Sequence, residues 1–301
     1  MEFPKALPAG IPLREWEHLA WANGHTKKEQ IHAEAAKIAD TVAWVKEAVL
    51  TVGDSPFFPN GPKKRASAGD IIALQDALQM AVPETDENKG LYAHLRLTGR
   101  FAHEITRRVN VRHALDYDAY AQNAAGNLHD AGKLTGVFRY HLNDLVTEHM
   151  LRVTGASYEV RECFPQTRFN IGPVTTSDAK KMGESELSRR IAEYAVHIRK
   201  TLAPRQEILI LADVCGKVKD PASGEIQTFE EMEEKHMSTR RSAAEYEAYI
   251  GQTALWPSEK YAYKHLPGLA EGWLGMYRQL REKWKSQGAD VDEIRKQLQD
   301  G

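Results

Sequence analysis

The sequence predicts an all-α protein, and three observations lead to that prediction. Apolar residues recur at helical spacing along most of the 301 residues, sustained strand-type alternation is almost absent, and Pro- and Gly-rich breaks separate the periodic segments. A chain of this length can bury a sizeable hydrophobic core, as one large domain or two ordinary ones. We therefore expect a protein built from helices that pack on helices.

The expected helices begin in the N-terminal part of the chain. The sequence TKKE at 26–29 fits a capping box, and apolar residues at helical spacing follow it to about Leu50. A Pro- and Gly-rich loop carries KKR at 63–65, which is most simply a solvated loop, with a role facing the substrate as the alternative. Ser67 is the expected start of the next helix.

Helical segments continue through the middle and the end of the chain. They are expected at 88–109, 116–130, 138–155, 185–202 and 205–218. After a Pro/Gly/Ser break near residue 221, an acidic helix from 228 leads into a helical tail rich in Trp and Tyr. The longest irregular stretch, 156–183, is the kind of insertion that is often functional or mobile, and it could form a lid.

Composition is neutral about partners and favours a cytoplasmic protein. Lys and Arg total 40 against 42 for Asp and Glu, a formal charge of -2, so no overall basic excess favours nucleic acid. The N-terminus lacks the pattern of a signal peptide, and no window approaches the ~20 apolar residues that span a bilayer. Cys163 and Cys215 are far apart and outside any CxxC, which disfavours a disulfide framework and a cysteine zinc site. We expect no membrane contact and a reducing compartment.

Two adjacent ionisable residues, His129 and Asp130, follow a largely apolar segment and lie in the stretch GNLHDAGKLTGVF, residues 126–138. Asp and Gly are turn formers, so one interpretation is that Asp130 starts a turn beside an ordinary packed imidazole. Burial of two polar side chains without partners costs roughly 1 to 3 kcal/mol each, however, and a bound metal would remove that cost. The pair is therefore a candidate metal site if further ligands exist.

His94 and Asp213 are the candidates for those further ligands. His94 shares one side of its helix with apolar residues at i+3, i+7 and i+11, whereas His103, nine residues later, falls on the opposite side. Asp213 ends the most apolar run of the chain, where a carboxylate needs a strong compensating partner. Lys217, one turn away, could be that partner in a structural ion pair, which is the alternative to a metal-ligand role.

Taken together, His94, the adjacent His129 and Asp130, and the distant Asp213 resemble the HD superfamily of metal-dependent phosphohydrolases. The family pattern is a helix-borne His, then adjacent His-Asp, then a distant Asp. LHDAGK matches the common HDxGK form of that family, and LILADVCGK is similar to its final-aspartate helix. The resemblance covers roughly residues 86–220 and implies an HD-domain helical core.

The resemblance also implies three parts to the chain. They are an N-terminal helical extension at 1–85, an HD metal-dependent phosphohydrolase core at 86–220 and a C-terminal helical extension at 221–301. The sequence leaves open whether the extensions pack over the core, shape the pocket or build the interface of a homo-oligomer. Packing is the simplest expectation for amphipathic helices.

The chemistry of this residue set suits a metal. Two neutral imidazoles and two carboxylates form a mixed nitrogen and oxygen site for divalent Mn, Fe, Co, Ni or Zn, one or two per chain, with positions open for water and substrate. Such a metal would activate water and neutralise a phosphoryl oxygen. By resemblance, Asp130 is both a ligand and the residue that orients the water.

Lys133 is the expected catalytic cation that neutralises phosphate, with an ordinary surface lysine at a helix start as the alternative. Small HD nucleotidases often carry an acidic residue at this place, as HDxxE. Lys133 therefore argues against a simple nucleoside-monophosphate phosphatase.

Several other polar residues are weaker candidates, because solvated polar faces and exposed charge pairs explain them more simply. Those for a second metal are His141, His149 and His197, with Asp144, Glu148 and Glu193 on the same helical faces. Those for substrate contact, besides Lys133, are Arg139 and Arg190.

The favoured function is a cytoplasmic metal-dependent phosphohydrolase that cleaves a phosphate ester or anhydride, with a nucleotide as the expected small-molecule substrate. An HD-type nuclease is one alternative, since HDAGKLTGVFRYHL is similar to the HD nuclease domains of CRISPR effector helicases. It ranks lower because the chain has no GxxxxGK[ST] motif and no basic excess. A di-iron oxygenase resembling myo-inositol oxygenase would need two more histidines, His141 or His149 together with His197. A catalytically inactive HD binding module is the last alternative.

Overall fold

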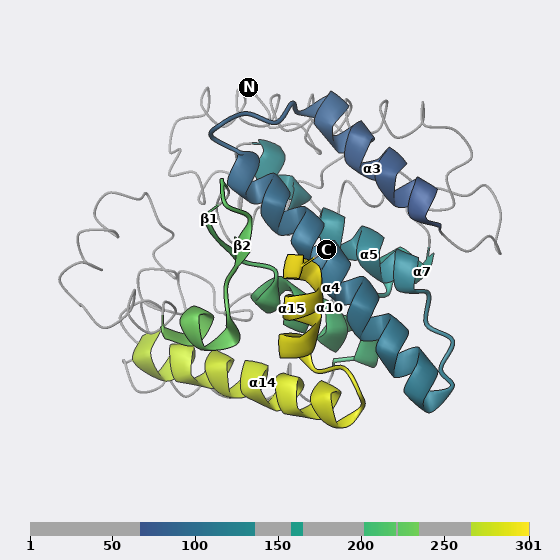
Figure 1. Cartoon of the computed structure of the whole chain (residues 1–301), viewed down its shortest axis with the longest axis vertical. Coiled ribbons are helices and arrows are strands. Elements are labelled where there is room, and N and C mark those ends of the chain that lie inside the picture. Colours follow the sequence, from purple (N-terminus) through teal and green to yellow (C-terminus); the bar gives the residue numbers. More distant parts are fainter. Residues whose placement is uncertain (1–66, 136–157, 165–201, 221, 235–265, 301) are drawn as a thin grey trace, which may run out of the picture.

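The computed structural model describes five stretches of the chain: residues 67–135, 158–164, 202–220, 222–234 and 266–300 (Figure 1). These residues are mostly helical, and a small two-stranded sheet is the only strand pairing among them. The prediction of an all-α fold is therefore confirmed for this part of the protein. The helices expected at 26–50, 138–155 and 185–202, and KKR at 63–65, lie outside the described residues.

The first described helix, α3 (Ala68–Ala81), begins where the sequence predicts it. The backbone N–H of Ser67 donates to the carboxylate of Asp70 at 2.8 Å, which is the contact expected of a capping box. At the other end of α3, the carbonyl oxygen of Leu78 accepts a hydrogen bond from the hydroxyl of Tyr92 at 3.1 Å. This bond ties α3 to the helix that follows it.

The long helix α4 (Lys89–His113) carries the buried face that the sequence predicts. His94, Leu97, Phe101 and Ile105 follow one another at helical spacing, and all four are buried. The described helices α5, α10 and α15 all pack against α4. It is thus the central helix of the described structure, as Figure 1 shows.

The helices on either side of the candidate site have favourable starts. α5 (Ala119–Leu128) is capped by Asp118, whose carboxylate accepts two backbone N–H groups of the first turn. A short 3₁₀ helix, η2 (Ala131–Thr135), follows α5 after a turn formed by His129 and Asp130. α10 (Pro204–Cys215) has proline in its first turn, where the missing N–H costs no helical hydrogen bond.

Two short segments differ from the sequence prediction. The stretch 156–183, expected to be irregular, contains the helical turn α7 (Tyr158–Arg161). The expected Pro/Gly/Ser break is a hairpin, in which β1 (Val218–Asp220) pairs antiparallel with β2 (Glu225–Ile226). These strands are too short to produce a recognisable alternation. Gly224 supplies the positive φ of 67° that the turn between them requires.

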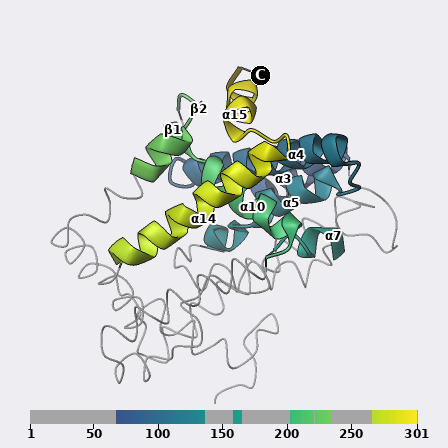
Figure 2. The same ribbon diagram turned by 90° about the horizontal axis from the view of Figure 1, so that it is seen from below.

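The C-terminal helices pack into the same core as the central helix. Buried side chains of α14 (Leu266–Ser286) and α15 (Val291–Asp300) join those of α4 and α10, and Trp284 among them is only 1% exposed. Figure 2 shows α14 lying across α10. None of the helices in the described ranges has both the length and the hydrophobicity needed to cross a membrane.

Candidate metal centre

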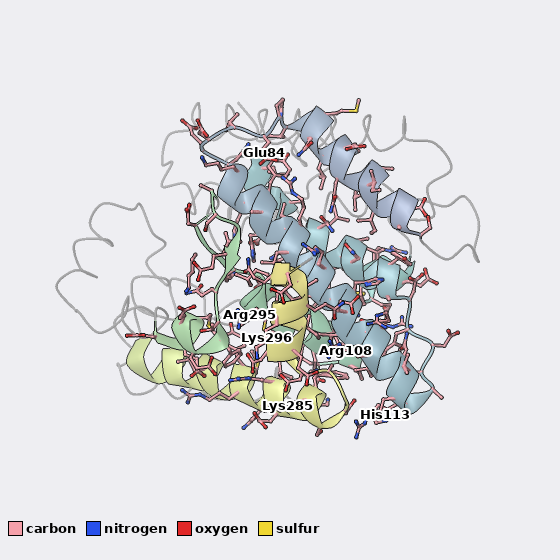
Figure 3. All side chains as sticks on the ribbon, in the orientation of Figure 1. Glu84, Arg108, His113, Lys285, Arg295 and Lys296 are labelled. Atoms are coloured by element: carbon pink, nitrogen blue, oxygen red, sulfur yellow. The ribbon has the colours of Figure 1, made fainter. Side chains whose placement is uncertain are left out.

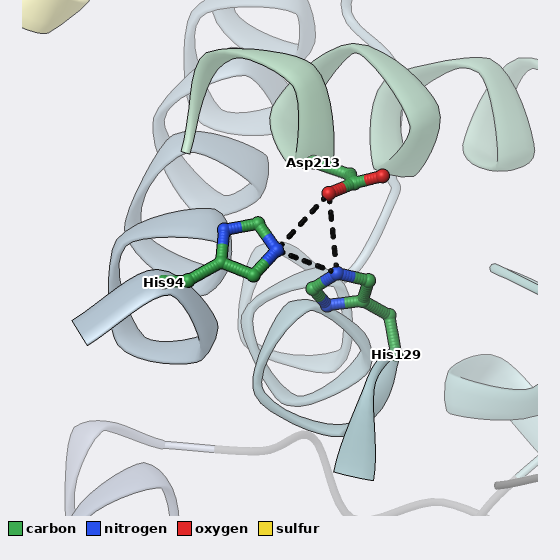
Figure 4. A group of neighbouring side chains, drawn as sticks. All are labelled: His94, His129 and Asp213. Atoms are coloured by element: carbon green, nitrogen blue, oxygen red, sulfur yellow. Dashed lines mark hydrogen bonds and ion pairs between the residues drawn. The ribbon is translucent and has the colours of Figure 1, made fainter. Parts of the chain in front are cut away.

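Three side chains that are distant in the sequence meet at one place. His94 lies on the buried face of α4, His129 is the C-cap residue of α5, and Asp213 lies in the last turn of α10. Figure 4 shows both imidazole rings turned toward the carboxylate of Asp213. The packing of α4 against α5 and α10 therefore assembles three of the four predicted ligands into one group that could hold a metal ion.

The distances within this group match those of ligands that share one cation. Nε2 of His94 is 3.1 Å from Nε2 of His129 and 3.1 Å from Oδ1 of Asp213. Nε2 of His129 is 3.3 Å from the same carboxylate oxygen. Two ligand atoms bound to a tetrahedral metal at about 2.0–2.1 Å lie about 3.3 Å apart. The three atoms are thus spaced for metal binding.

The hydrogen bonds of the outer ring nitrogens fix the tautomer of both histidines. Nδ1 of His94 lies 2.6 Å from the carbonyl oxygen of Gly216, and Nδ1 of His129 lies 2.8 Å from that of Gly126. A carbonyl oxygen only accepts, so each Nδ1 must carry the hydrogen. In the neutral rings the two Nε2 atoms are therefore both acceptors, although they face each other. A cation between them resolves this conflict, and such Nδ1 bonds are typical of metal-binding histidines.

Close packing at two glycines brings the ligand helices near enough for these bonds. A Cβ atom on Gly126 of α5 would lie 2.5 Å from Cα of Gly99 on α4. A Cβ atom on Gly216, just after α10, would lie 2.3 Å from the hydroxyl oxygen of Thr98 and 2.9 Å from its Cα. Any larger residue would push the helices apart. Both glycines therefore position the histidines in two ways: the missing side chain permits close packing, and the carbonyl oxygen accepts the Nδ1 hydrogen bond.

Asp130, the fourth predicted ligand, lies beside the group of three. Its Oδ2 is 3.5 Å from Nε2 of His129 and 3.7 Å from Nε2 of His94. The same oxygen accepts a short hydrogen bond from the ammonium of Lys133. Asp130 is only 8% exposed. The adjacent His-Asp pair is therefore a buried polar pair with partners, and its aspartate is within reach of the same site.

A second lysine, two residues after the end of α10, contacts the site. The ammonium of Lys217 donates to Oδ1 of Asp213 at 2.8 Å and lies 3.1 Å from Nε2 of His94. The structural ion pair considered from the sequence therefore exists, and it shares the carboxylate oxygen that faces the two histidines. Because 40% of the Lys217 side chain is exposed, its ammonium has access to solvent.

Charges around the site keep both carboxylates ionised. Burial opposes ionisation of Asp213, but the Lys217 ammonium and His129 hold its pKa well below the usual range. Burial likewise opposes ionisation of Asp130, while His129, His94 and Lys133 lower its pKa. Burial and Lys217 act to lower the pKa of His94, but its two carboxylate neighbours raise it above the ordinary value. Both carboxylates are thus anionic, and each shares its charge with a neighbouring lysine.

The residues present fit a divalent metal. The Nε2 atoms of two imidazoles and one ionised carboxylate oxygen converge, and a second carboxylate lies close by. This donor set suits a borderline divalent transition metal. The buried thiols of Cys163 and Cys215 are both free and take no part in the group.

Other residues singled out from the sequence lie away from this group or outside the described ranges. His103 is on another side of α4, where it contacts Glu104 at 3.3 Å and the ring of Tyr120. The candidates for a second metal and for further substrate contact, His141, His149, His197, Arg139 and Arg190, are not among the described residues.

Two features of the site were not expected from the sequence. The carbonyl oxygens of Gly126 and Gly216 orient the histidines, and a glycine three residues before His129 was the available signal for the first of them. Lys217 was expected only to pair with Asp213, and its contact with His94 depends on how α10 ends against α4.

The chain was also compared with known proteins. No protein-family model, no curated protein and no solved structure gave a significant match.

Proposed function

We propose that this protein is a metal-dependent phosphohydrolase that cleaves a phosphate ester or anhydride with metal-activated water. A nucleotide is the expected substrate, and Mn, Fe, Co, Ni and Zn are the candidate metals. The convergence of His94, His129 and Asp213 is the single observation that carries this proposal. The resemblance of the motif order, and of the HDAGK sequence, to the HD superfamily adds the reaction class.

Each residue of the site has a distinct part in the proposed reaction. His94, His129 and Asp213 would hold the metal, and the glycine carbonyls would keep both Nδ1 atoms protonated so that the Nε2 atoms stay available. The metal, when bound, would supply a water of lowered pKa and charge neutralisation at a phosphoryl oxygen.

Asp130 and Lys133 would complete the catalytic set. The carboxylate of Asp130 lies 3.5 Å from Nε2 of His129, at the edge of the metal position, so it would orient the water that the metal activates. Lys133, bonded to Asp130, would neutralise the charge of the phosphate oxygen that enters beside it. The ion pair with Lys133 would also fix the position of the Asp130 carboxylate.

The test compares wild-type protein with the Asp130→Ala variant. Both would be reconstituted with each candidate metal and assayed against a panel of phosphate monoesters, diesters, anhydrides and nucleotides. We expect metal-dependent hydrolysis by the wild type and none by the variant, with circular dichroism showing that the variant is folded.

A matched control separates this effect from a general effect of charge. Asp86→Asn removes an exposed carboxylate that pairs with the surface residue Lys89, and it should hydrolyse as the wild type does. Unchanged turnover in Asp130→Ala, or no turnover of any substrate class by the wild type, would contradict the proposal.

One observation favours a second function, a metal-free module that binds without catalysis. Lys217 already donates to Asp213 and contacts Nε2 of His94, so a cation neutralises part of the site without a metal. In that case the protein would retain no metal after reconstitution. Elemental analysis of the purified protein therefore distinguishes the two functions.

A further inference from the structure

Each carboxylate of the candidate metal centre already lies against a lysine. Lys133 pairs with Asp130, and Lys217 pairs with Asp213. The two lysines come from different parts of the chain, η2 and the residues that follow α10. Two ammonium groups therefore balance two carboxylates before any metal is present.

This balance changes what a bound metal requires. In a site with two unpaired carboxylates, a divalent metal is neutralised by its ligands. Here the carboxylate of Asp130 is already paired with Lys133, and that of Asp213 with Lys217. A divalent metal therefore adds positive charge that these two ion pairs do not offset. An anion that binds at the metal would supply the missing negative charge.

Lys217 is the residue most affected by metal binding. Its ammonium is 2.8 Å from Oδ1 of Asp213 and 3.1 Å from Nε2 of His94, two of the three atoms that would hold the metal. A metal on those atoms repels the ammonium at close range. The long flexible stem of lysine and its 40% exposed side chain allow the ammonium to turn from the carboxylate toward an anion above the site.

We propose that Lys217 and Lys133 together form an anion subsite beside the metal position, so that the metal and a phosphate group bind cooperatively. This inference rests on the proposed function and narrows its substrate class to compounds that present a phosphate dianion, such as a terminal phosphate, at the metal. A phosphodiester carries only one negative charge at the phosphate, so it offsets less of the positive charge of the metal and the two lysines.

The test measures metal binding in the presence and absence of inorganic phosphate. Mn²⁺ would be titrated into the full-length metal-free protein, with the free ion measured by electron paramagnetic resonance. We expect phosphate to tighten Mn²⁺ binding by about tenfold, within the usual range of coupling between two ligands. By the same linkage, Mn²⁺ should tighten phosphate binding by an equal factor. This readout does not depend on turnover.

Variants of the lysine separate this role from a structural one. Lys217→Met should bind Mn²⁺ more tightly than the wild type without phosphate, because a competing cation is gone, and should lose most of the coupling. Lys217→Arg, which keeps the charge, should retain coupling. Lys219→Met is the matched control, since Lys219 is two residues away and pairs with Glu225 and Glu231 on the surface.

The outcomes distinguish this inference from the proposed function. Absence of phosphate coupling in the wild type, or equal coupling in Lys217→Met and wild type, overturns the two-lysine subsite while Mn²⁺ binding leaves the metal centre intact. If the wild type binds no Mn²⁺ with or without phosphate, the metal centre itself is contradicted, and both proposals fail. If Lys217→Met does not fold, Lys133→Met provides the same comparison with the other lysine of the subsite.

Discussion

The two halves of α4 are built in different ways. The first half presents His94 and Gly99 to a polar site, where glycines permit close approach and backbone carbonyls orient imidazoles. The second half presents Ile105 and Val109 to an apolar core that includes Trp284. Leu97 and Phe101 of the first half also join that core, so the first half is distinguished by the geometry and hydrogen bonding that it adds at the site. The two halves should therefore respond differently to mutation.

The largest effect is expected in the apolar half. Trp284→Ala removes a side chain that is 1% exposed and should lower the free energy of unfolding by about 3–5 kcal/mol. Urea unfolding followed by circular dichroism measures this change. The folded fraction should still bind one metal with wild-type affinity. A weakened metal site in folded Trp284→Ala protein would show that the two halves are not independent.

The next effect is expected where α4 and α5 cross. Gly126→Ala places a Cβ atom 2.5 Å from Cα of Gly99, and overpacking of this kind typically costs about 1–3 kcal/mol. It should also weaken metal binding, because the carbonyl that orients His129 belongs to the same residue. Unfolding and metal titrations on one sample measure both.

A second glycine substitution provides the control for that experiment. Gly275 lies in α14 with no atom near its Cβ position, so Gly275→Ala should raise stability by up to about 1 kcal/mol through helix propensity. Its metal affinity should equal that of the wild type. Equal behaviour of the two alanine variants would contradict the role assigned to the close crossing.

A smaller effect is expected at the contact between α3 and α4. Tyr92→Phe removes the hydroxyl that donates to the carbonyl oxygen of Leu78 and should cost about 1 kcal/mol. Burial, together with Glu84, raises the pKa of Tyr92 from 10.0 to about 12.

That raised pKa predicts a pH dependence with a definite sign. The folded state favours the protonated phenol, so its contribution to stability is complete below about pH 10 and is lost as the pH rises toward about 12. Wild-type protein should therefore lose more stability than Tyr92→Phe over that interval. Parallel losses in the two proteins would contradict this assignment.

The smallest effect is expected at the surface of the apolar half. Figure 3 shows Arg108 beside α15, where it pairs with Glu293 at 2.9 Å. Glu293→Gln should lower stability by about 0.2–1 kcal/mol, and salt should reduce the difference further. Thermal unfolding at low and high ionic strength measures this. A loss that is larger and independent of salt would place this pair with the core contacts.

The same contrast explains which parts could be predicted from the sequence. Helical spacing correctly predicted that His94, Leu97, Phe101 and Ile105 lie on one buried face of α4. Such a face can be predicted because it depends only on the spacing of apolar residues along one segment. The start of α3 at Ser67 follows from local capping chemistry. Both features depend on residues close together in the chain.

Features that depend on distant segments could not be predicted in the same way. The approach of Gly126 to Gly99, and the position of Lys217 beside His94, arise only when α5 and α10 pack on α4. The hairpin after α10 was missed because its strands have three and two residues, too few for a periodic pattern. The side chains of the group that could hold a metal were therefore predictable, whereas the groups that orient them were not.

The most direct test of the metal centre is the metal content of the protein after reconstitution with Mn, Fe, Co, Ni or Zn, measured by elemental analysis beside His129→Ala and Asp213→Asn. We expect at least one tightly bound metal per chain in the wild type and its loss in both variants. No retained metal in the wild type, or the same metal content in all three proteins, would contradict it.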